Sequence, residues 1–324
     1  MQSMKNYMVI RRDSPTFDSD IISSFKETGQ CLISEPFPHY ITIMNHIRSR
    51  LDGVFENKYS IKADEPWHNE TTERIFNPHL FPMNPKVLDS VFPEDLHKLC
   101  GVVYKASRQL GMMVLRSFDL EFGTNLIECH TPTETVKDGS HMVLIKYLEK
   151  PSIADSRMKH HCDIGTITIL HVFDETEDLE IRTDKESSNW TTASFAPAVV
   201  INVGETLQAW LNNKISAVPH RVVNKHNKRR YTMPIFMAPG GGAPLPEHVL
   251  EHRDYQKRIE QDVHEDPNVG EFIKSLSSEQ LQQLYVVISS IPQEDPDDIY
   301  IPVSLNIAKK YHYLQKLFEK EMIK

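Results

Sequence analysis

The sequence reads His160-His161-Cys162-Asp163-Ile164-Gly165-Thr166-Ile167-Thr168-Ile169-Leu170 near its middle, and Val218-Pro219-His220-Arg221-Val222 further along. Side chains two positions apart on a strand point to the same face, so His161 and Asp163 can offer an imidazole and a carboxylate to one ion. His220 can complete the set from a second predicted strand. Two histidines and one carboxylate on one face of a metal leave other coordination positions open, which is the ligand set of non-haem Fe(II) oxygenases.

His160 is the neighbouring alternative as a ligand. It cannot share a strand face with Asp163, so we expect it to have a structural role or to support a ligand. The chain has 16 histidines, and a lone His-x-Asp pattern therefore has little specificity. The context of His161-Cys162-Asp163 makes this pattern more specific. It precedes one predicted strand, and His220 lies in a second predicted strand that follows a turn-rich stretch.

Ten residues after His220 the sequence reads Arg230-Tyr231-Thr232. On a strand, Arg230 and Thr232 share a face, and Pro234 and Phe236 continue it. A guanidinium pairs with a carboxylate through two parallel hydrogen bonds, and a hydroxyl two positions along can add a third. This run predicts a binding site for a carboxylate.

Composition bounds the classes of protein that remain. The 324 residues allow one large domain or two ordinary ones, and the net charge of −9 argues against a general nucleic-acid binder. No apolar run is long enough to span a bilayer, and Met1 to Arg12 lacks the apolar core of a secretory signal. We therefore expect a cytoplasmic protein without membrane or nucleic-acid partners. The four cysteines are widely spaced and form no zinc or redox motif.

The hydrophobic periodicity changes along the chain and predicts a mainly β fold with flanking helices. Helical spacing over 18–28, 40–55 and 93–122 predicts a helical N-terminal part, about 1–135, with short strands over 7–10 and 31–34. Residues 67–85 are rich in Pro and Asn and predict a loop. Short strands over 142–147, 166–173, 179–183, 198–203, 220–224 and 231–237 predict a jelly-roll core at about 140–240. Helices over 248–262, 277–284 and 307–322 predict a C-terminal extension of about 241–324, all within a single domain over 1–324.

The order of these elements resembles the isopenicillin-N-synthase-like Fe(II)/2-oxoglutarate-dependent dioxygenases. The resemblance runs from about Asp18 to Pro246. It rests on Lys26-Glu27-Thr28-Gly29 before a strand, the long helix with Leu110-Gly111, Leu144-Ile145-Lys146-Tyr147, His161-Cys162-Asp163, Asn202-Val203-Gly204-Glu205, Pro219-His220-Arg221-Val222 and Arg230-Tyr231-Thr232.

The resemblance implies a double-stranded β-helix, a distorted jelly roll, and a set of cofactors. Fe(II) would be held by His161, Asp163 and His220, and 2-oxoglutarate would chelate the iron and extend its distal carboxylate to Arg230 and Thr232. O2 would be the oxidant, with ascorbate as a reductant in vitro. Succinate and CO2 would be released as a substrate is hydroxylated, cyclised or desaturated. Thr232 stands where the family usually has Ser, which keeps the hydroxyl.

Tyr147 matches a family tyrosine whose phenol reaches cosubstrate or substrate; the alternative is a buried Tyr with another partner. The substrate itself is predicted from strand alternation. If the strand extends back from His161, Lys159 and Arg157 lie on the inward face and can meet an anionic group, which favours a carboxylate-bearing metabolite or amino acid. Alternatively, both side chains lie in a solvated loop. Phe236, on the same face as Arg230, is a third candidate substrate residue.

Three other functions remain open from sequence alone. Isopenicillin N synthase keeps the Arg-x-Ser pair for its substrate, so an oxoglutarate-independent iron oxidase is the nearest alternative, and succinate release would distinguish the two. A second alternative is a protein that binds or scaffolds without turnover. The presence of all four residues His161, Asp163, His220 and Arg230 counts against this alternative. A zinc hydrolase fits the ligands but leaves Arg230 without a role. We take the protein to be a monomer that acts on a small molecule.

Overall fold

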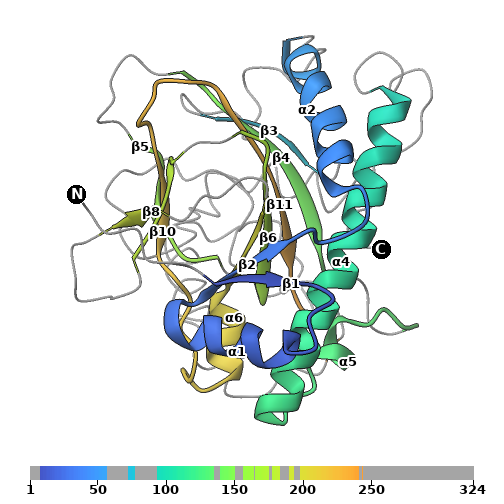
Figure 1. The fold of residues 1–324 in the computed structure, drawn as a ribbon, viewed down its shortest axis with the longest axis vertical. Coiled ribbons are helices and arrows are strands. Elements are labelled where there is room, and N and C mark those ends of the chain that lie inside the picture. Colours follow the sequence, from blue (N-terminus) through green and yellow to red (C-terminus); the bar gives the residue numbers. More distant parts are fainter. Residues whose placement is uncertain are drawn as a thin grey trace, which may run out of the picture.

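The computed structural model describes residues 8–56, 72–76, 93–134, 139–149, 156–163, 165–174, 177–182, 190–192, 198–240 and 243. In this part of the chain two β-sheets face each other (Figure 1). The larger has the strand order β1-β2-β9-β6-β11-β4-β3 and the smaller β5-β10-β7-β8. The strands are β1 Val9–Arg11, β2 Gln30–Ser34, β3 Thr72–Phe76, β4 His141–Tyr147, β5 Ser156–His161, β6 Ile167–Val172, β7 Leu179–Ile181, β8 Thr191–Thr192, β9 Val199–Val203, β10 His220–Val223 and β11 Arg230–Met237.

The helices are α1 Phe17–Thr28, α2 Tyr40–Glu56, α4 Glu94–Phe122, α5 Leu126–His130 and α6 Glu205–Trp210. Figure 1 shows α2 and α4 on the side of the larger sheet that faces away from β5 and β10. Helix α1 ends where predicted, because Gly29 adopts the left-handed conformation (φ +69°) and donates its backbone N–H to Phe25 O. Helix α4 approaches the sheet closely at Gly111, where a Cβ atom would lie 2.0 Å from the Met237 sulfur.

Strand alternation divides the apolar residues between two clusters. On β4, Met142 and Leu144 pack in the large outer cluster with the helices, while Val143, Ile145 and Tyr147 pack in an inner cluster between the sheets. The remaining inner members come from β7, β10 and the turn before β10, with partly buried neighbours on β5, β6 and β11: Leu179, Ile181, Val218, Val222, Met158, Leu170 and Phe236. The space between the sheets is therefore lined by one face of β4, β6, β7, β10 and β11, with Met158 of β5 beside it.

Most predicted elements are confirmed to within one or two residues. The predicted loop over 67–85 is wrong for Thr72–Phe76, which forms strand β3 on the edge beside β4. Strand β5 was considered only as a possible backward extension from His161 and was not among the predicted strands, because its residues are mostly polar or charged. Short strand β8 and the short helices α5 and α6 were not predicted either, because they are too brief to show a period. The predicted C-terminal helices lie outside the described residues. No helix in the described part of the chain is long and apolar enough to cross a bilayer.

Candidate metal centre and active site

Strands β5 and β10 bring the two candidate histidine ligands together. His220, the first residue of β10, lies directly opposite His161, the last residue of β5, and their ring centroids are 4.3 Å apart. Directly opposite residues on antiparallel strands point to the same face. The pairing register of the smaller sheet therefore accounts for the proximity of two residues that are distant in the sequence.

Asp163 also lies beside the two histidines but, contrary to the prediction from sequence, it is not on the strand of His161. Strand β5 ends at His161, so Asp163 lies in the connection to β6, and the argument from strand alternation is wrong for it. Instead, its backbone carbonyl accepts the N–H of Glu205 at 2.7 Å. A Cβ atom on Gly204 would lie 2.0 Å from the carbonyl oxygen of Gly165. The connection is thus held closely against the start of α6.

The three side chains fit a divalent metal ion. Oδ1 of Asp163 lies 3.8 Å from Nε2 of His161 and 3.7 Å from Nε2 of His220, and one ligand atom from each of the three residues lies within 4.8 Å of the others. Nδ1 of His220 contacts the carbonyl oxygen of Val218 at 3.0 Å, so Nδ1 carries the proton and Nε2 offers its lone pair. Oδ2 of Asp163 is buried and has no hydrogen-bond partner among the described residues. Two neutral imidazoles and a carboxylate suit Fe(II).

Arg230 and Thr232 lie inside the molecule on β11, with exposed fractions of 0% and 1%. The three guanidinium nitrogens of Arg230 and the hydroxyl of Thr232 have no hydrogen-bond partner in the described part of the protein. Burial lowers the pKa of the Arg230 guanidinium, while Tyr147 and Asp178 oppose the shift. A buried cation without a direct hydrogen-bond partner is costly, and the geometry therefore fits the binding of an anionic ligand.

Tyr147 lies directly opposite Arg230 across β4 and β11, and the guanidinium carbon is 5.2 Å from the centre of its ring. The phenol ring is buried. The ring of Tyr147 therefore lies against the Arg230 guanidinium on the inner face of β4.

Strand β5 begins at Ser156, so Arg157 lies within the strand. The strand therefore extends back from His161, which is one of the two alternatives considered from the sequence. The solvated-loop alternative is wrong for Arg157, whose side chain is fully buried. It forms an ion pair with Asp178 (Nη1 to Oδ2 3.5 Å) and donates a hydrogen bond to Asn224. The charge of Arg157 therefore has a partner within the protein. The side chain of Lys159 lies outside the described residues.

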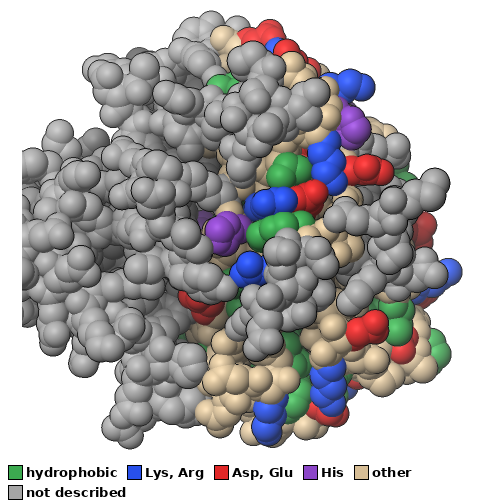
Figure 2. All heavy atoms as spheres, turned by 90° about the vertical axis from the view of Figure 1, so that its left-hand side faces the viewer, with side chains coloured by type: hydrophobic (Ala, Val, Ile, Leu, Met, Phe, Trp, Pro, Cys, Tyr) green, Lys and Arg blue, Asp and Glu red, His purple; other side chains and the backbone are tan. Residues whose placement is uncertain are grey.

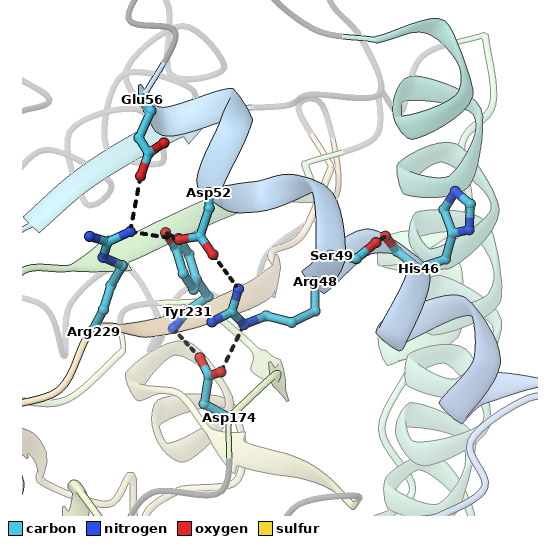
Figure 3. A network of polar contacts seen from close by, with 8 residues as sticks. All are labelled: His46, Arg48, Ser49, Asp52, Glu56, Asp174, Arg229 and Tyr231. Carbon is cyan, nitrogen blue, oxygen red and sulfur yellow. Dashed lines mark hydrogen bonds and ion pairs between the residues drawn. The ribbon is translucent and has the colours of Figure 1, made fainter.

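A polar network holds the start of β11 against α2 (Figure 3). Arg48 of α2 donates to Asp174, which follows β6, at 2.7 Å, and Asp174 accepts the backbone N–H of Tyr231 at 2.8 Å. Asp52 of α2 accepts from the Tyr231 hydroxyl at 2.6 Å and from Arg229 at 2.7 Å. Residues on both sides of Arg230 are thus fixed. Sequence reasoning missed this network, because its members belong to three separate elements.

Comparison with known proteins agrees with this geometry. A profile of the 2OG-Fe(II) oxygenase superfamily matches residues 139–239, which contain all of the candidate ligands. This part of the chain is a 2OG-Fe(II) oxygenase domain. Among its relatives, a feruloyl CoA ortho-hydroxylase of Ipomoea batatas is 27% identical over 69% of each chain. Gibberellin 2-beta-dioxygenase 6 of Oryza sativa subsp. japonica is 30% identical over 37% of this chain and 35% of its own.

Solved structures show the same fold for this oxygenase. Dioxygenase for auxin oxidation 1 of Arabidopsis thaliana, in complex with 2-oxoglutarate, has a TM-score of 0.61 at 17% identity, covering 77% of this chain and 98% of its own. The fold is the double-stranded β-helix expected from the sequence. The protein is an Fe(II)- and 2-oxoglutarate-dependent oxygenase, and its cofactors are Fe(II), 2-oxoglutarate and O2.

Proposed function

We propose that His161, Asp163 and His220 hold the Fe(II), and that Arg230 and Thr232 hold the distal carboxylate of 2-oxoglutarate. The observation that carries this proposal is the pairing of two incomplete sites in one interior space. One is a set of three metal-ligand side chains, and the other is a buried guanidinium without a hydrogen-bond partner among the described residues. A dicarboxylate with one end on the metal and the other on Arg230 completes both.

The substrate in this proposal is a small organic molecule that binds between the two sheets. When bound, the iron supplies an oxidant from O2 and 2-oxoglutarate, with succinate and CO2 as co-products. The residues of this chain hold the metal, orient the cosubstrate and exclude water with the inner apolar cluster. Hydroxylation is the expected outcome, and cyclisation and desaturation are alternatives.

The prediction of a carboxylate-bearing substrate now depends mainly on Lys159, because Arg157 has Asp178 as its partner. A Lys159→Ala variant is expected to raise the Michaelis constant for an acidic substrate several-fold. If the Michaelis constant of Lys159→Ala is unchanged, β5 no longer provides support for an acidic substrate.

We also infer that the partners are small molecules rather than nucleic acids. Figure 2 shows basic, acidic and hydrophobic side chains interspersed over the described part of one face, without a continuous basic field there. Nucleic-acid backbones require such a field. The net charge of −9 agrees with this inference.

A substrate screen with a matched inactive variant tests the proposal. Small molecules, acidic and neutral, are incubated with the protein, Fe(II), ascorbate and 2-oxoglutarate, and succinate and product masses are measured. We expect one succinate for each product, and loss of both in an Asp163→Ala variant that remains folded. Product formation without 2-oxoglutarate, or full activity of Asp163→Ala, would contradict the proposal.

A further inference from the structure

Besides His220, three histidines are buried in the described part of the chain: His130, His141 and His171. The rings of His130 and His171 each have hydrogen-bond partners at both nitrogens. These partners are Leu126 O (2.7 Å) and Thr166 Oγ1 (2.8 Å) for His130, and Ser107 Oγ (2.8 Å) and the Tyr40 hydroxyl (3.3 Å) for His171. These two rings are satisfied members of the protein interior.

His141 differs from both. It is 9% exposed, and neither of its ring nitrogens has a hydrogen-bond partner among the described residues. Its ring stacks on Phe236 with centroids 4.9 Å apart and planes inclined by 21°. A buried polar group without a partner costs roughly 1–3 kcal/mol, so an interior imidazole of this kind requires an explanation.

Strand alternation places His141 on the face of β4 that looks into the space between the sheets. Val143, Ile145 and Tyr147 share its face, and all three pack in the inner cluster. Phe236, on which the ring stacks, packs against the same cluster. The two unpartnered nitrogens therefore belong to the interior that contains the proposed active site.

The pairing of β4 with β11 gives this interior two distinct ends. Arg230 lies opposite Tyr147 at one end, and Phe236 lies opposite His141 six positions further along β11. At about 3.3 Å per residue the two pairs are about 20 Å apart. A five-carbon diacid held at Arg230 is much shorter than this, so it leaves the end with His141 to another ligand. Thr166, three positions after Asp163, donates its backbone N–H to the carbonyl oxygen of Met237, next to Phe236, at 2.7 Å, so this end lies near the connection that carries Asp163.

Thr168 of β6 extends the polar character of this end. It lies opposite Phe236 on the other side from His141, it is 3% exposed, and its hydroxyl has no hydrogen-bond partner among the described residues. Phe236 thus lies between two buried polar side chains, and its own side chain is only partly buried. The arrangement offers an aromatic surface with hydrogen-bonding groups on both sides.

We propose that His141 and Thr168, with Phe236 between them, form the substrate-binding subsite of this oxygenase and take an uncharged, hydrogen-bonding group such as an amide, a lactam or a hydroxyl. The inference rests on the proposed function, because it uses the position of the cosubstrate at Arg230. Burial lowers the pKa of His141 to about 4, so at neutral pH the ring is neutral and presents one donor and one acceptor. The Thr168 hydroxyl can act as either. No charged group is needed to match them.

Binding of small probes tests the subsite without knowledge of the natural substrate. The full chain is loaded with Mn(II), which does not turn over, and with 2-oxoglutarate, and affinities are measured by ligand-observed NMR. The probes are benzamide, 2-pyridone and benzyl alcohol, with toluene as the apolar control and benzoate as the anionic control. We expect at least one uncharged polar probe to bind about ten-fold more tightly than both controls.

Substitutions at His141 and Thr168 test whether the preference for uncharged polar probes arises from this subsite. His141→Leu should abolish it, His141→Gln should retain most of it, and Thr168→Val should reduce it. His171→Leu, a matched change at a buried histidine outside the subsite, should leave it intact while lowering stability. Absence of any preference in the wild type, or an equal preference in His141→Leu, would overturn the inference. The affinity for 2-oxoglutarate, measured in the same samples, reports separately on the proposed function, which fails if the metal-loaded wild type does not bind it.

Discussion

Replacement of Arg230 by Met should separate the stability of the protein from its affinity for cosubstrate. Arg230 is fully buried, and its nitrogens have no hydrogen-bond partner among the described residues. Replacing a buried charge by an apolar side chain of similar volume is often neutral or stabilising, although the contact with the Tyr147 ring is lost. We therefore expect the unfolding free energy of the ligand-free variant to lie within about 2 kcal/mol of wild type.

The affinity for 2-oxoglutarate should change far more. Leaving a buried carboxylate without its charged partner costs roughly 2–5 kcal/mol, which raises the dissociation constant by about 30-fold to 4,000-fold. At a concentration of 100 times its dissociation constant, 2-oxoglutarate should stabilise the wild type by about 2.7 kcal/mol. At the same concentration the variant should gain less than about 1 kcal/mol.

The assay is thermal and urea unfolding of the Mn(II)-loaded protein with increasing 2-oxoglutarate. Thr232→Val provides a graded comparison, because it removes one neutral hydrogen bond and should weaken binding by about ten-fold at most. Wild-type affinity in Arg230→Met would refute the carboxylate site. Unfolding of the ligand-free variant would instead refute the expectation that the fold does not require the Arg230 guanidinium.

Three further predictions concern the framework of the site. Burial alone would raise the pKa of Asp52, but hydrogen bonds from Tyr231, Arg229 and Arg48 lower it to about 2. The network therefore stabilises the fold fully above about pH 4 and loses its effect as the pH falls towards 2. Because Asp52 is 46% exposed, the unfolding free energy lost between pH 6 and pH 2 should be only about 1 kcal/mol smaller in Asp52→Asn than in the wild type. An identical pH dependence of the two proteins would contradict this. Gly204→Ala should displace the connection that carries Asp163, because the added Cβ atom would meet the carbonyl oxygen of Gly165. Metal affinity in a Mn(II) titration should fall by about 10-fold to 100-fold. An unchanged affinity would show that the connection can relax. Gly111→Val should force α4 from the sheet at Met237 and cost about 1–3 kcal/mol in urea unfolding, with the 2-oxoglutarate affinity as an internal control; full stability would mean that Met237 can move aside.

The parts of the site that lie on regular strands could be predicted from the sequence. The face shared by Arg230, Thr232 and Phe236 follows from a period of two residues, and the pairing of β11 with β4 agrees with it. Such features depend only on local alternation and on the choice of the buried face. His161 and His220, in contrast, lie opposite each other because β5 pairs with β10, and of these two strands only β10 was predicted.

The features that sequence reasoning missed depend on pairing register and on connections. The strand predicted around Asp163 ends before it, and a contact between the Gly204 and Gly165 backbones determines its position instead. The ion pair of Arg157 with Asp178 joins a strand and a turn that no local pattern connects. His141 carried a weak signal, as a polar residue in phase with Val143 and Ile145 at the start of an apolar strand. Only its lack of hydrogen-bond partners among the described residues distinguishes it from a buried structural histidine.

The metal site and the cosubstrate site are tested most directly by an anaerobic titration of the protein with Fe(II) and 2-oxoglutarate, followed by visible absorption. Chelation of protein-bound Fe(II) by 2-oxoglutarate produces a charge-transfer band, and the measurement requires no substrate. We expect a band that saturates at one iron per chain and requires 2-oxoglutarate. It should be lost in His220→Ala and should need far more 2-oxoglutarate in Arg230→Met. Absence of the band in the wild type, or an unaltered band in His220→Ala, would contradict the assignment of this site.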